Sequence, residues 1–513
     1  MIYDLQSDSP ISLCADVCIV GAGAAGIALA VELAHRGKRV LLLEGGGSNL
    51  KDETQEPYRS EIAGLPHRGV HDGRFRVHGG TTTQWGGQIL ELDELDFADR
   101  SWIPQSGWPF AKSELIPFYS RALELEGVDR SILNDEDVWR TLGETRPSLA
   151  DMDTYLSRWC PEPNFARLHK SALEGPSVDV WLHATAVELL LDGTRAVGIR
   201  TCTQNGKQAA FKADEYVFCL GAIESSRFFL QPRSGQLPWN SSGLLGCHFQ
   251  DHIDCNAATV IPRSRREWQR RFDSIFLRGF KYQPKIKLSA RTTQDERILN
   301  TAASMSSESE SAEALAGTRT AAKHLLGGRF RELRAAHLAG IVRHSPSFLQ
   351  QTYRYVAKSR SYQPPDAVIS LRVHCEQEPT SRSRITLSDQ RDSLGLLRTK
   401  LSWTISPLEL RSIRRFVAHA QSAFDSIAKV IPSPALSSDA ALIERSQDSF
   451  HHMGGMRMHA APSHGVVTPD LRLHGIDNAY VCSSAVFPTS GFSNPTHTLI
   501  ALAVRLARHL AAH

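Results

Sequence analysis

The sequence predicts a protein of the α/β class, α+β overall, with a parallel sheet in one domain and a mainly antiparallel sheet flanked by helices in the other. Residues 16–47 read as an apolar strand, a tight glycine turn, a small-residue helix and a second apolar strand, which is one βαβ unit. Segments 178–200 and 208–219 alternate like paired strands. Strand character returns over 367–405, and residues 407–430 have the period of a long amphipathic helix.

The composition excludes several classes of function. The 513 residues include 58 basic and 55 acidic ones, and a net charge of +3 is too small for the broad basic field that nucleic acid requires. Nine cysteines without a C-x-x-C pair predict reduced thiols, which favours the cytoplasm. The apolar stretch from Val17 to Leu33 is interrupted by glycines and carries Glu32, so neither a signal peptide nor a membrane span is expected.

A glycine-rich turn indicates a dinucleotide site in a Rossmann-like domain. It lies between the first strand and the helix of the βαβ unit and reads Gly21-Ala22-Gly23-Ala24-Ala25-Gly26. The first glycine makes the turn, the second lets the backbone approach a pyrophosphate, and the third lets helix and strand pack closely. Glu44 ends the second strand, where a carboxylate accepts hydrogen bonds from a ribose and repels a 2′-phosphate, so NADP is disfavoured. NAD and FAD are not distinguished, because both carry the same ADP half.

Three segments far apart in the chain carry a resemblance to a known family. They are residues 78–87 (HGGTTTQWGG), 451–458 (HHMGGMRM) and 486–496 (VFPTSGFSNPT). Together they resemble the glucose-methanol-choline (GMC) oxidoreductases, and segments 217–230 and 245–255 add to the likeness. The most similar branch is that of sugar oxidases and dehydrogenases of the pyranose oxidase and fructose dehydrogenase type. The resemblance implies an FAD-dependent enzyme.

The resemblance also implies two domains built from discontinuous segments. The FAD-binding domain is expected to comprise residues 1–100, 155–260 and 440–513. The substrate-binding domain is expected to comprise residues 101–154 and 261–439, with a helical insertion or lid over 300–350.

The family pattern places further residues at the cofactor. Besides the fingerprint residues Gly21, Gly23, Ala24, Ala25, Gly26 and Glu44, contacts with FAD are expected at Gly79, Gly80, Thr81, Thr82, Gln84, Trp85, Gly86, Gly87, Val187, Gly221, Ala222, Glu224, Ser483, Ser484, Asn494, Pro495 and Thr496. Some relatives attach FAD covalently through a histidine at the position of Gln84. A glutamine amide cannot form that bond, so noncovalent FAD is expected.

A histidine and an asparagine are the expected catalytic pair. Alcohol oxidation by a flavin needs a base for the hydroxyl proton, and a neutral histidine suits this role because its pKa lies near working pH. His451 matches the catalytic histidine of the family motif, and the adjacent His452 is its rival. Asn494 matches the second catalytic position, where an amide donates a hydrogen bond to the substrate oxygen without titrating.

The expected function is therefore oxidation of an alcohol group (a CH–OH donor) of a sugar, glycoside or related polyol, with hydride transfer to flavin N5. The electron acceptor stays open among oxygen, a quinone and a redox protein. Two alternatives remain: a flavin-dependent monooxygenase or amine oxidase, and a non-catalytic flavoprotein subunit. No metal is expected, because the other histidines are not spaced as a ligand set; they include His67, His71, His248 and His252.

Overall fold

The βαβ unit predicted from the sequence forms the centre of the first sheet. A computed structural model of the chain describes residues 1–8, 14–129, 131–232, 237–309 and 345–512. Strand β2 (Cys14–Val20) leads through the glycine turn into α1 (Ala24–His35) and on to β3 (Val40–Leu43). β2 and β3 pair in parallel, with Val17 opposite Val40. The α/β prediction is confirmed, and the small side chains of α1 let it lie close against the sheet.

Five parallel pairs and one antiparallel meander make up this sheet. Its other strands are β1 (Ile2–Asp4), β7 (Val178–Leu182), β8 (Thr185–Asp192), β9 (Arg195–Cys202), β10 (Gln208–Phe218) and β20 (Ala479–Val481). The strand order is β1-β7-β3-β2-β10-β9-β8, and β20 pairs with β10. The pairs β8–β9 and β9–β10 are antiparallel, and the remaining pairs are parallel. The carboxyl ends of the parallel strands therefore lie at one edge, where ligands bind in such sheets.

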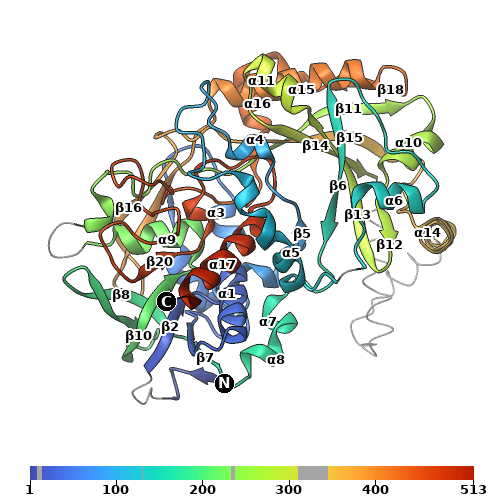
Figure 1. Cartoon of the computed structure of the whole chain (residues 1–513). Helices are drawn as coiled ribbons and strands as arrows, with labels where there is room; N and C mark the ends of the chain where they lie inside the picture. The colour runs from blue at the N-terminus through green and yellow to red at the C-terminus, as the bar shows by residue number, and fades with distance from the viewer. Residues whose placement is uncertain (9–13, 130, 233–236, 310–344, 513) are drawn as a thin grey trace.

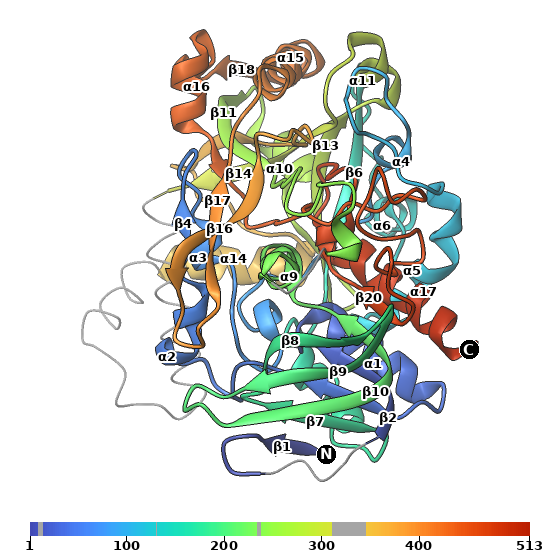
Figure 2. The ribbon, with the colours of Figure 1, turned by 90° about the vertical axis from the view of Figure 1, so that its left-hand side faces the viewer.

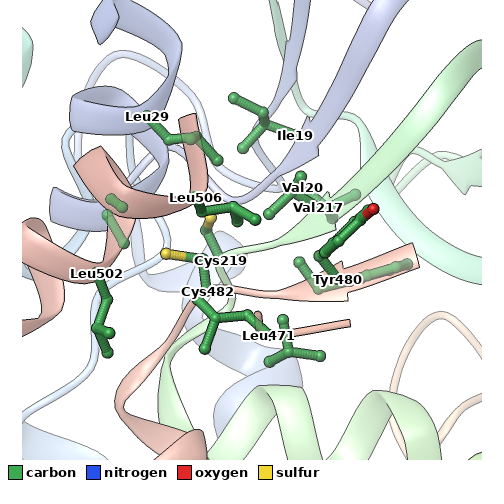
Figure 3. Close-up of a cluster of buried hydrophobic side chains, with 14 of the residues drawn as sticks. Ile19, Val20, Leu29, Val217, Cys219, Leu471, Tyr480, Cys482, Leu502 and Leu506 are labelled. Carbon is green, nitrogen blue, oxygen red and sulfur yellow. The ribbon is translucent and has the colours of Figure 1, made fainter. Parts of the chain in front are cut away.

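The C-terminal helix is held against this sheet by a large hydrophobic core. Helix α17 (Pro495–Ala511) packs against α1, and Figure 3 draws Leu502 and Leu506 of α17 in one buried cluster with Leu29 of α1 and Ile19 of β2. All four side chains are almost fully buried. Burial of one such side chain contributes about 1.5–3 kcal/mol, so the start of α17 is firmly fixed relative to the glycine turn.

A second sheet is antiparallel throughout. Its strands are β5 (Gln88–Ile89), β6 (Met152–Trp159), β11 (Ile253–Pro262), β12 (Ile275–Leu277), β13 (Phe280–Leu288), β14 (Thr301–Glu308), β15 (Val368–Cys375), β18 (Ala428–Pro432) and β19 (Gln447–Asp448). The order is β18-β11-β15-β14-β13-β6-β5, with β12 beside β13 and β19 beside β11. The prediction of a mainly antiparallel second sheet is confirmed.

Helices cover one face of the second sheet. Figure 1 shows α11 (Ala290–Glu296), α15 (Pro407–Phe424) and α16 (Asp439–Arg445) together at its outer side. The long amphipathic helix expected over 407–430 is α15, which begins at a capping box formed by Ser406 and Glu409. Its buried face meets β11, β14 and β15 in a separate hydrophobic core. The opposite face of the sheet is left for a site.

A small third sheet and several short helices complete the fold. The third sheet has the order β16-β17-β4, formed by β16 (Arg384–Arg391), β17 (Leu397–Ser402) and β4 (Glu61–Ile62). Figure 2 shows α9 (Gly221–Leu230) at the centre of the molecule, between the first sheet below and the second above. The other helices are α2 (Asp52–Gln55), α3 (Gly69–Asp72), α4 (Glu94–Phe97), α5 (Ile116–Leu125), α6 (Asp135–Thr141), α7 (Phe165–Leu168), α8 (Lys170–Leu173), α10 (Arg265–Phe272) and α14 (Ser345–Lys358).

Some domain boundaries expected from the sequence fall inside strands. Positions 155 and 260 lie within β6 and β11, which are both strands of the second sheet. Of the insertion expected over 300–350, the first part is β14 and the last belongs to α14, while 310–344 lies outside the described residues. Among the helices described, none has the length and apolar character needed to cross a membrane.

Candidate active site

The three fingerprint glycines meet different surroundings. Gly21 has φ of +104°, and a Cβ there would lie 2.5 Å from the carbonyl oxygen of Cys219. A Cβ on Gly26 would lie 1.9 Å from the carbonyl oxygen of Gly21, so only glycine lets the helix approach the strand. A Cβ on Gly23, by contrast, would meet no protein atom within 4 Å. The space in front of Gly23 is open, as a pyrophosphate site requires.

Glu44 anchors the glycine turn and also faces its cavity. One carboxylate oxygen accepts a hydrogen bond from the backbone N–H of Ala22 at 3.0 Å, and the other accepts from Gly46 at 2.8 Å. Burial raises the pKa of Glu44, while these hydrogen bonds and nearby Arg76 oppose the shift. Each oxygen keeps a second lone pair for a ribose hydroxyl.

Arg76 is a cavity residue that sequence reasoning missed. Its guanidinium donates to the hydroxyl of Thr185 at 2.6 Å and to the carbonyl oxygen of Gly45 at 3.3 Å, while its Nε is buried without a partner in the described chain. It lines the same cavity as Glu44. The available signal was its position just before the 78–87 motif, which the motif itself does not include.

The loop 79–87 packs directly on the glycine turn. The N–H of Gly79 donates to the carbonyl oxygen of Ala22 at 3.0 Å. A Cβ on Gly80 would lie 2.8 Å from the Cα of Gly23, so the two backbones touch. Trp85 is held by a 2.7 Å hydrogen bond from its indole nitrogen to the carbonyl oxygen of Pro163. The glycine turn and the loop 79–87 are therefore in direct backbone contact, although they are far apart in the sequence.

Two adjoining cavities collect most of the residues predicted at the cofactor. The first, at the glycine turn, is lined by Gly21, Gly23, Ala24, Ala25, Glu44, Gly80, Thr81, Thr82, Trp85, Gly221, Glu224, Ser483 and Thr496. The second is lined by Thr81, Gln84, Trp85, Gly86, Gly221, Ala222, His451, Ser484, Asn494, Pro495 and Thr496. They share Thr81, Trp85, Gly221 and Thr496. An elongated site thus runs from the open space at Gly23 to His451, which fits a dinucleotide with its reactive ring at the histidine end.

Four predicted cofactor residues line neither cavity. Gly26, Gly79 and Gly87 lie behind the cavity walls, and Gly87 packs against Cys160. Val187 also lies outside, whereas Thr185 and Ala186 line the first cavity. A register shift in β8 between Ala186 and Glu188 interrupts the simple alternation of side chains there.

His451 and Asn494 lie in hydrogen-bonding contact. Nε2 of His451 is 2.8 Å from the side-chain nitrogen of Asn494, and Nδ1 of His451 is 2.9 Å from Nδ1 of His252. Asn494 directly precedes α17, and His451 follows β19 closely. His252 belongs to segment 245–255 and was not among the predicted site residues, although the Asp-His pair of that segment was a visible signal.

The neighbours of His451 determine which ring nitrogen carries its proton. Nε2 of His252 faces the carbonyl oxygen of Ser490 at 3.5 Å, and a carbonyl can only accept. Neutral His252 therefore carries its proton on Nε2 and accepts at Nδ1. His451 must then donate from Nδ1, which leaves a lone pair on Nε2 that accepts from the amide of Asn494. A neutral histidine with an unprotonated Nε2 can act as a proton acceptor.

Both adjacent histidines are neutral, but they face different groups. Burial lowers the pKa of His451 to about 3; His252 adds to this shift and Asp251 opposes it. Burial likewise lowers the pKa of His452 to about 3. The ring of His452 packs against His67 and Phe249 rather than Asn494. Of the two adjacent histidines, His451 is the one that contacts Asn494.

Asp251 holds the loop that carries His451. One of its carboxylate oxygens accepts from the backbone N–H groups of His252 at 2.7 Å, Ser449 at 3.2 Å and His451 at 3.0 Å. The side chain is fully buried. Burial alone would raise the pKa of Asp251, but His67 and the neighbouring histidines hold it below its ordinary value. Asp251 therefore accepts as a carboxylate.

His67, Asp251 and His452 form the group of metal-ligand type in the described part of the chain. Their ligand atoms lie within 4.8 Å of one another. Nδ1 of His67, however, accepts a hydrogen bond from the backbone N–H of Val70 at 3.2 Å, so its proton lies on Nε2. Nε2 points at Asp251 across 3.3 Å, although the angle falls short of a regular hydrogen bond. A protonated nitrogen is a donor, and this chemistry favours a carboxylate–imidazole contact over metal ligation.

A third cavity lies between His451, Asn494 and the second sheet. It shares Gln88, His451 and Asn494 with the second cavity. Side chains of three neighbouring strands line its sheet side: Gln283, Lys285, Ser304, Ser306, Arg372 and His374. The wall is polar, and sequence reasoning missed it because alternation in a strand does not tell which face meets a site.

Comparisons with known proteins match two parts of the chain to family models. The family model described as "GMC oxidoreductase" matches residues 379–503, and the model described as "FAD binding domain" matches residues 16–51. The C-glycoside 3-oxidase of Microbacterium trichothecenolyticum is 30% identical over 149 residues, which is 29% of this chain and 28% of that protein's length. The paromamine 6′-oxidase of Streptomyces fradiae is 22% identical over 97% of this chain and 91% of its own.

Solved structures share the fold along nearly the whole chain. Pyridoxine 4-oxidase from Mesorbium loti has a TM-score of 0.60 at 18% identity, covering 97% of this chain and 99% of that one. A formate oxidase variant from Aspergillus oryzae RIB40, studied for FAD modification, has a TM-score of 0.57 at 16% identity, covering 98% and 99%. At these identities the likeness concerns the fold alone.

Proposed function

We propose that this chain, which belongs to the GMC oxidoreductases, oxidises an alcohol group of a sugar, glycoside or related polyol, with FAD as cofactor and His451 as the base. The observation that carries the proposal is the unprotonated Nε2 of His451, which faces the Asn494 amide where the cofactor cavity meets the polar cavity of the second sheet. A base at that junction reaches a substrate hydroxyl that is also next to the reactive end of the cofactor site.

The chain provides residues suited to each part of the FAD cofactor. The open backbone at Gly23 and the start of α1 suit the pyrophosphate, Glu44 and Arg76 suit the adenosine half, and the loop 79–87 suits the ring system. FAD, when bound there, supplies the acceptor for a hydride. Gln84 lines the ring end of the site, and its amide has no nucleophile for a covalent link, so we propose noncovalent attachment.

The protein residues act on the hydroxyl proton. Neutral His451 accepts this proton at Nε2 as the carbon–hydrogen bond of the alcohol breaks. Asn494 directs its amide toward the same point and orients the alcohol oxygen without changing charge. His252 keeps the proton of His451 on Nδ1 throughout, and Asp251 holds the loop through the backbone of His451.

The polar cavity supports a polyhydroxylated substrate. Its sheet wall presents amide, hydroxyl and charged groups, with Met305 as its apolar member. Relatives named C-glycoside 3-oxidase and paromamine 6′-oxidase lend support to a sugar-like donor.

An anaerobic spectrum tests the proposal. Purified protein loaded with FAD is mixed without oxygen with sugars, glycosides and simple alcohols, and bleaching of the flavin bands with a carbohydrate is the expected result. Acid precipitation should release the yellow colour into solution. Reoxidation by air, by a quinone or by a redox protein then identifies the acceptor. A flavin that stays oxidised with every alcohol, or a protein that cannot take up FAD, would contradict the proposal.

A further inference from the structure

Lys285 is a buried cation without a partner at the active site. It lies on β13, opposite Ser304 of β14, and its side chain is only 8% exposed. It lines the same cavity as His451 and Asn494. Within the part of the chain that the structure describes, its ammonium group makes neither an ion pair nor a hydrogen bond. A buried ammonium group is costly unless something pairs with it.

The other cations near Lys285 on this face of the second sheet each interact with another side chain. Lys287 binds Asp93 at 2.6 Å, and Lys281 lies 4.0 Å above the ring of Trp159. Arg372, across the sheet from Ser304, forms a bidentate contact with Asp254 that includes two bonds of 2.8 Å. Both carboxylate oxygens of Asp254 therefore already accept hydrogen bonds from Arg372. Among the described residues on this face, Lys285 is the cation that has neither a hydrogen bond nor an ion pair, and Asp254 acts on it only through its field.

The nearest carboxylates around the cavity are similarly unavailable. Asp448, which also lines it, accepts from the backbone N–H of Arg68 at 2.7 Å with one oxygen and from Gly69 at 2.8 Å with the other.

The positive charge of Lys285 acts on two histidines of the cavity. It contributes to the lowered pKa of His451 and of His374. Lys285 and His451 therefore lie close enough for one bound substrate to contact both in the same cavity.

We propose that the substrate carries an anionic group, a carboxylate or a phosphate, which binds Lys285 while its alcohol lies between His451 and Asn494. The inference rests on the proposed alcohol oxidation and narrows its substrate to acidic carbohydrates. The anion supplies the missing partner of a cation that is largely shielded from solvent, and charge-assisted hydrogen bonds are stronger than neutral ones. Polar groups on the same wall, including the amide nitrogen of Gln88, which is buried without a partner among the described residues, serve the remaining hydroxyls.

The geometry also disfavours other substrates. A positively charged alcohol would meet the Lys285 ammonium group, while the carboxylates that line the cavity, Asp254 and Asp448, already accept hydrogen bonds from other groups. A neutral glycoside would leave the ammonium group buried and unpaired. Burial lowers the pKa of Lys285 to about 8, so the group is still mostly charged at neutral pH.

A matched set of carbohydrates tests the proposal. A methyl hexoside, the corresponding methyl uronide, the 6-phosphate and the amino sugar present similar rings with neutral, carboxylate, phosphate and cationic groups. Binding to the FAD-loaded protein is measured by calorimetry, and flavin reduction by anaerobic stopped flow. We expect one of the two acids to bind at least about 10-fold more tightly than the neutral sugar, equivalent to about 1.4 kcal/mol, and the amino sugar to bind most weakly.

Two substitutions make the test specific. Lys285→Met should lower the preference for the acid over the neutral sugar by about 10-fold, and Lys285→Arg should keep most of it. Lys281→Met, which removes a charge from the same strand and face, is the control and should change this ratio less than twofold. Equal binding of acidic and neutral sugars, or an unchanged ratio in Lys285→Met with its flavin spectrum intact, would overturn the inference. Failure of every alcohol to reduce the flavin would instead count against the proposed function, since calorimetry still reports acid binding.

Discussion

Nδ1 of His252 lies 2.9 Å from Nδ1 of His451, and this contact orients the imidazole that we propose as the base. Because Nε2 of His252 faces the carbonyl oxygen of Ser490, the shared proton belongs to His451. The proton-accepting nitrogen of His451 is consequently the one that faces Asn494 and the cavities. His252 is thus a positioning residue whose effect on substrate is exerted through His451.

Loss of His252 should therefore slow proton transfer without removing the cofactor. His252→Ala deletes the acceptor for Nδ1–H, so His451 can adopt the other tautomer, and we expect flavin reduction to slow by about 10-fold or more. His252→Asn offers an amide oxygen to the same proton and should restore part of the rate. Stopped-flow reduction gives the rate, while the flavin spectrum reports the bound cofactor. A His252→Ala enzyme with the wild-type rate and pH profile would show that the contact has no orienting role.

The adjacent histidines can be separated by single substitutions. His451→Ala removes the base and should lower the rate of flavin reduction by about 10²-fold or more while FAD stays bound. His452→Ala, in the buried group with His67, should have a much smaller effect on that rate. The comparison uses the same substrate and the same anaerobic mixing experiment for both variants. A larger loss in His452→Ala than in His451→Ala would reverse the assignment.

The sequence predicts local features of this chain better than contacts between distant segments. The βαβ unit is predictable because strand, turn and helix follow one another within residues 16–47, each with its own period. The proposed pair His451 and Asn494 came from motifs that each contain one partner. His252, Lys285 and Arg76 were not predicted, because their contacts depend on strands and loops brought together from distant segments.

The domain boundaries illustrate the same limit. Residues 152–159 and 253–262 alternate as strands, but alternation does not reveal which sheet a strand joins. Both pair with the antiparallel sheet, through β13 for β6 and through β15 for β11. The sheet to which each strand belongs is decided by its pairing, and β13 and β15 lie more than a hundred residues away along the chain from β6 and β11.

Two glycines of the fingerprint should respond differently to a side chain. At Gly23 the backbone is extended and a Cβ meets no protein atom within 4 Å, so Gly23→Val should fold yet fail to bind FAD. At Gly26 a Cβ would collide with the carbonyl oxygen of Gly21, so Gly26→Val should lose stability even without cofactor. Thermal melts of the apoproteins and titration with FAD distinguish the two effects. A fully yellow Gly23→Val protein would contradict the placement of the pyrophosphate.

The two neutral histidines predict how stability depends on pH. Burial lowers the pKa of both His451 and His452 to about 3, whereas a histidine in the unfolded chain titrates near 6.5. Below pH 6.5 the unfolded chain therefore takes up protons that the folded chain does not, so the free energy of unfolding falls as the pH falls from about 6.5 toward 3. Each histidine contributes up to about 1.4 kcal/mol per pH unit in this window.

A single substitution isolates one of these contributions. His452→Phe removes one titrating group, so its stability should fall less steeply than that of the wild type between pH 6.5 and 5, whatever its stability at pH 7.5. Denaturant unfolding at fixed pH values gives the slopes, and the other buried histidines cancel in the comparison. Wild-type and variant slopes that coincide would mean that His452 takes up its proton in the folded state near the ordinary pH. Its burial between His67 and Phe249 would then fail to keep the ring neutral.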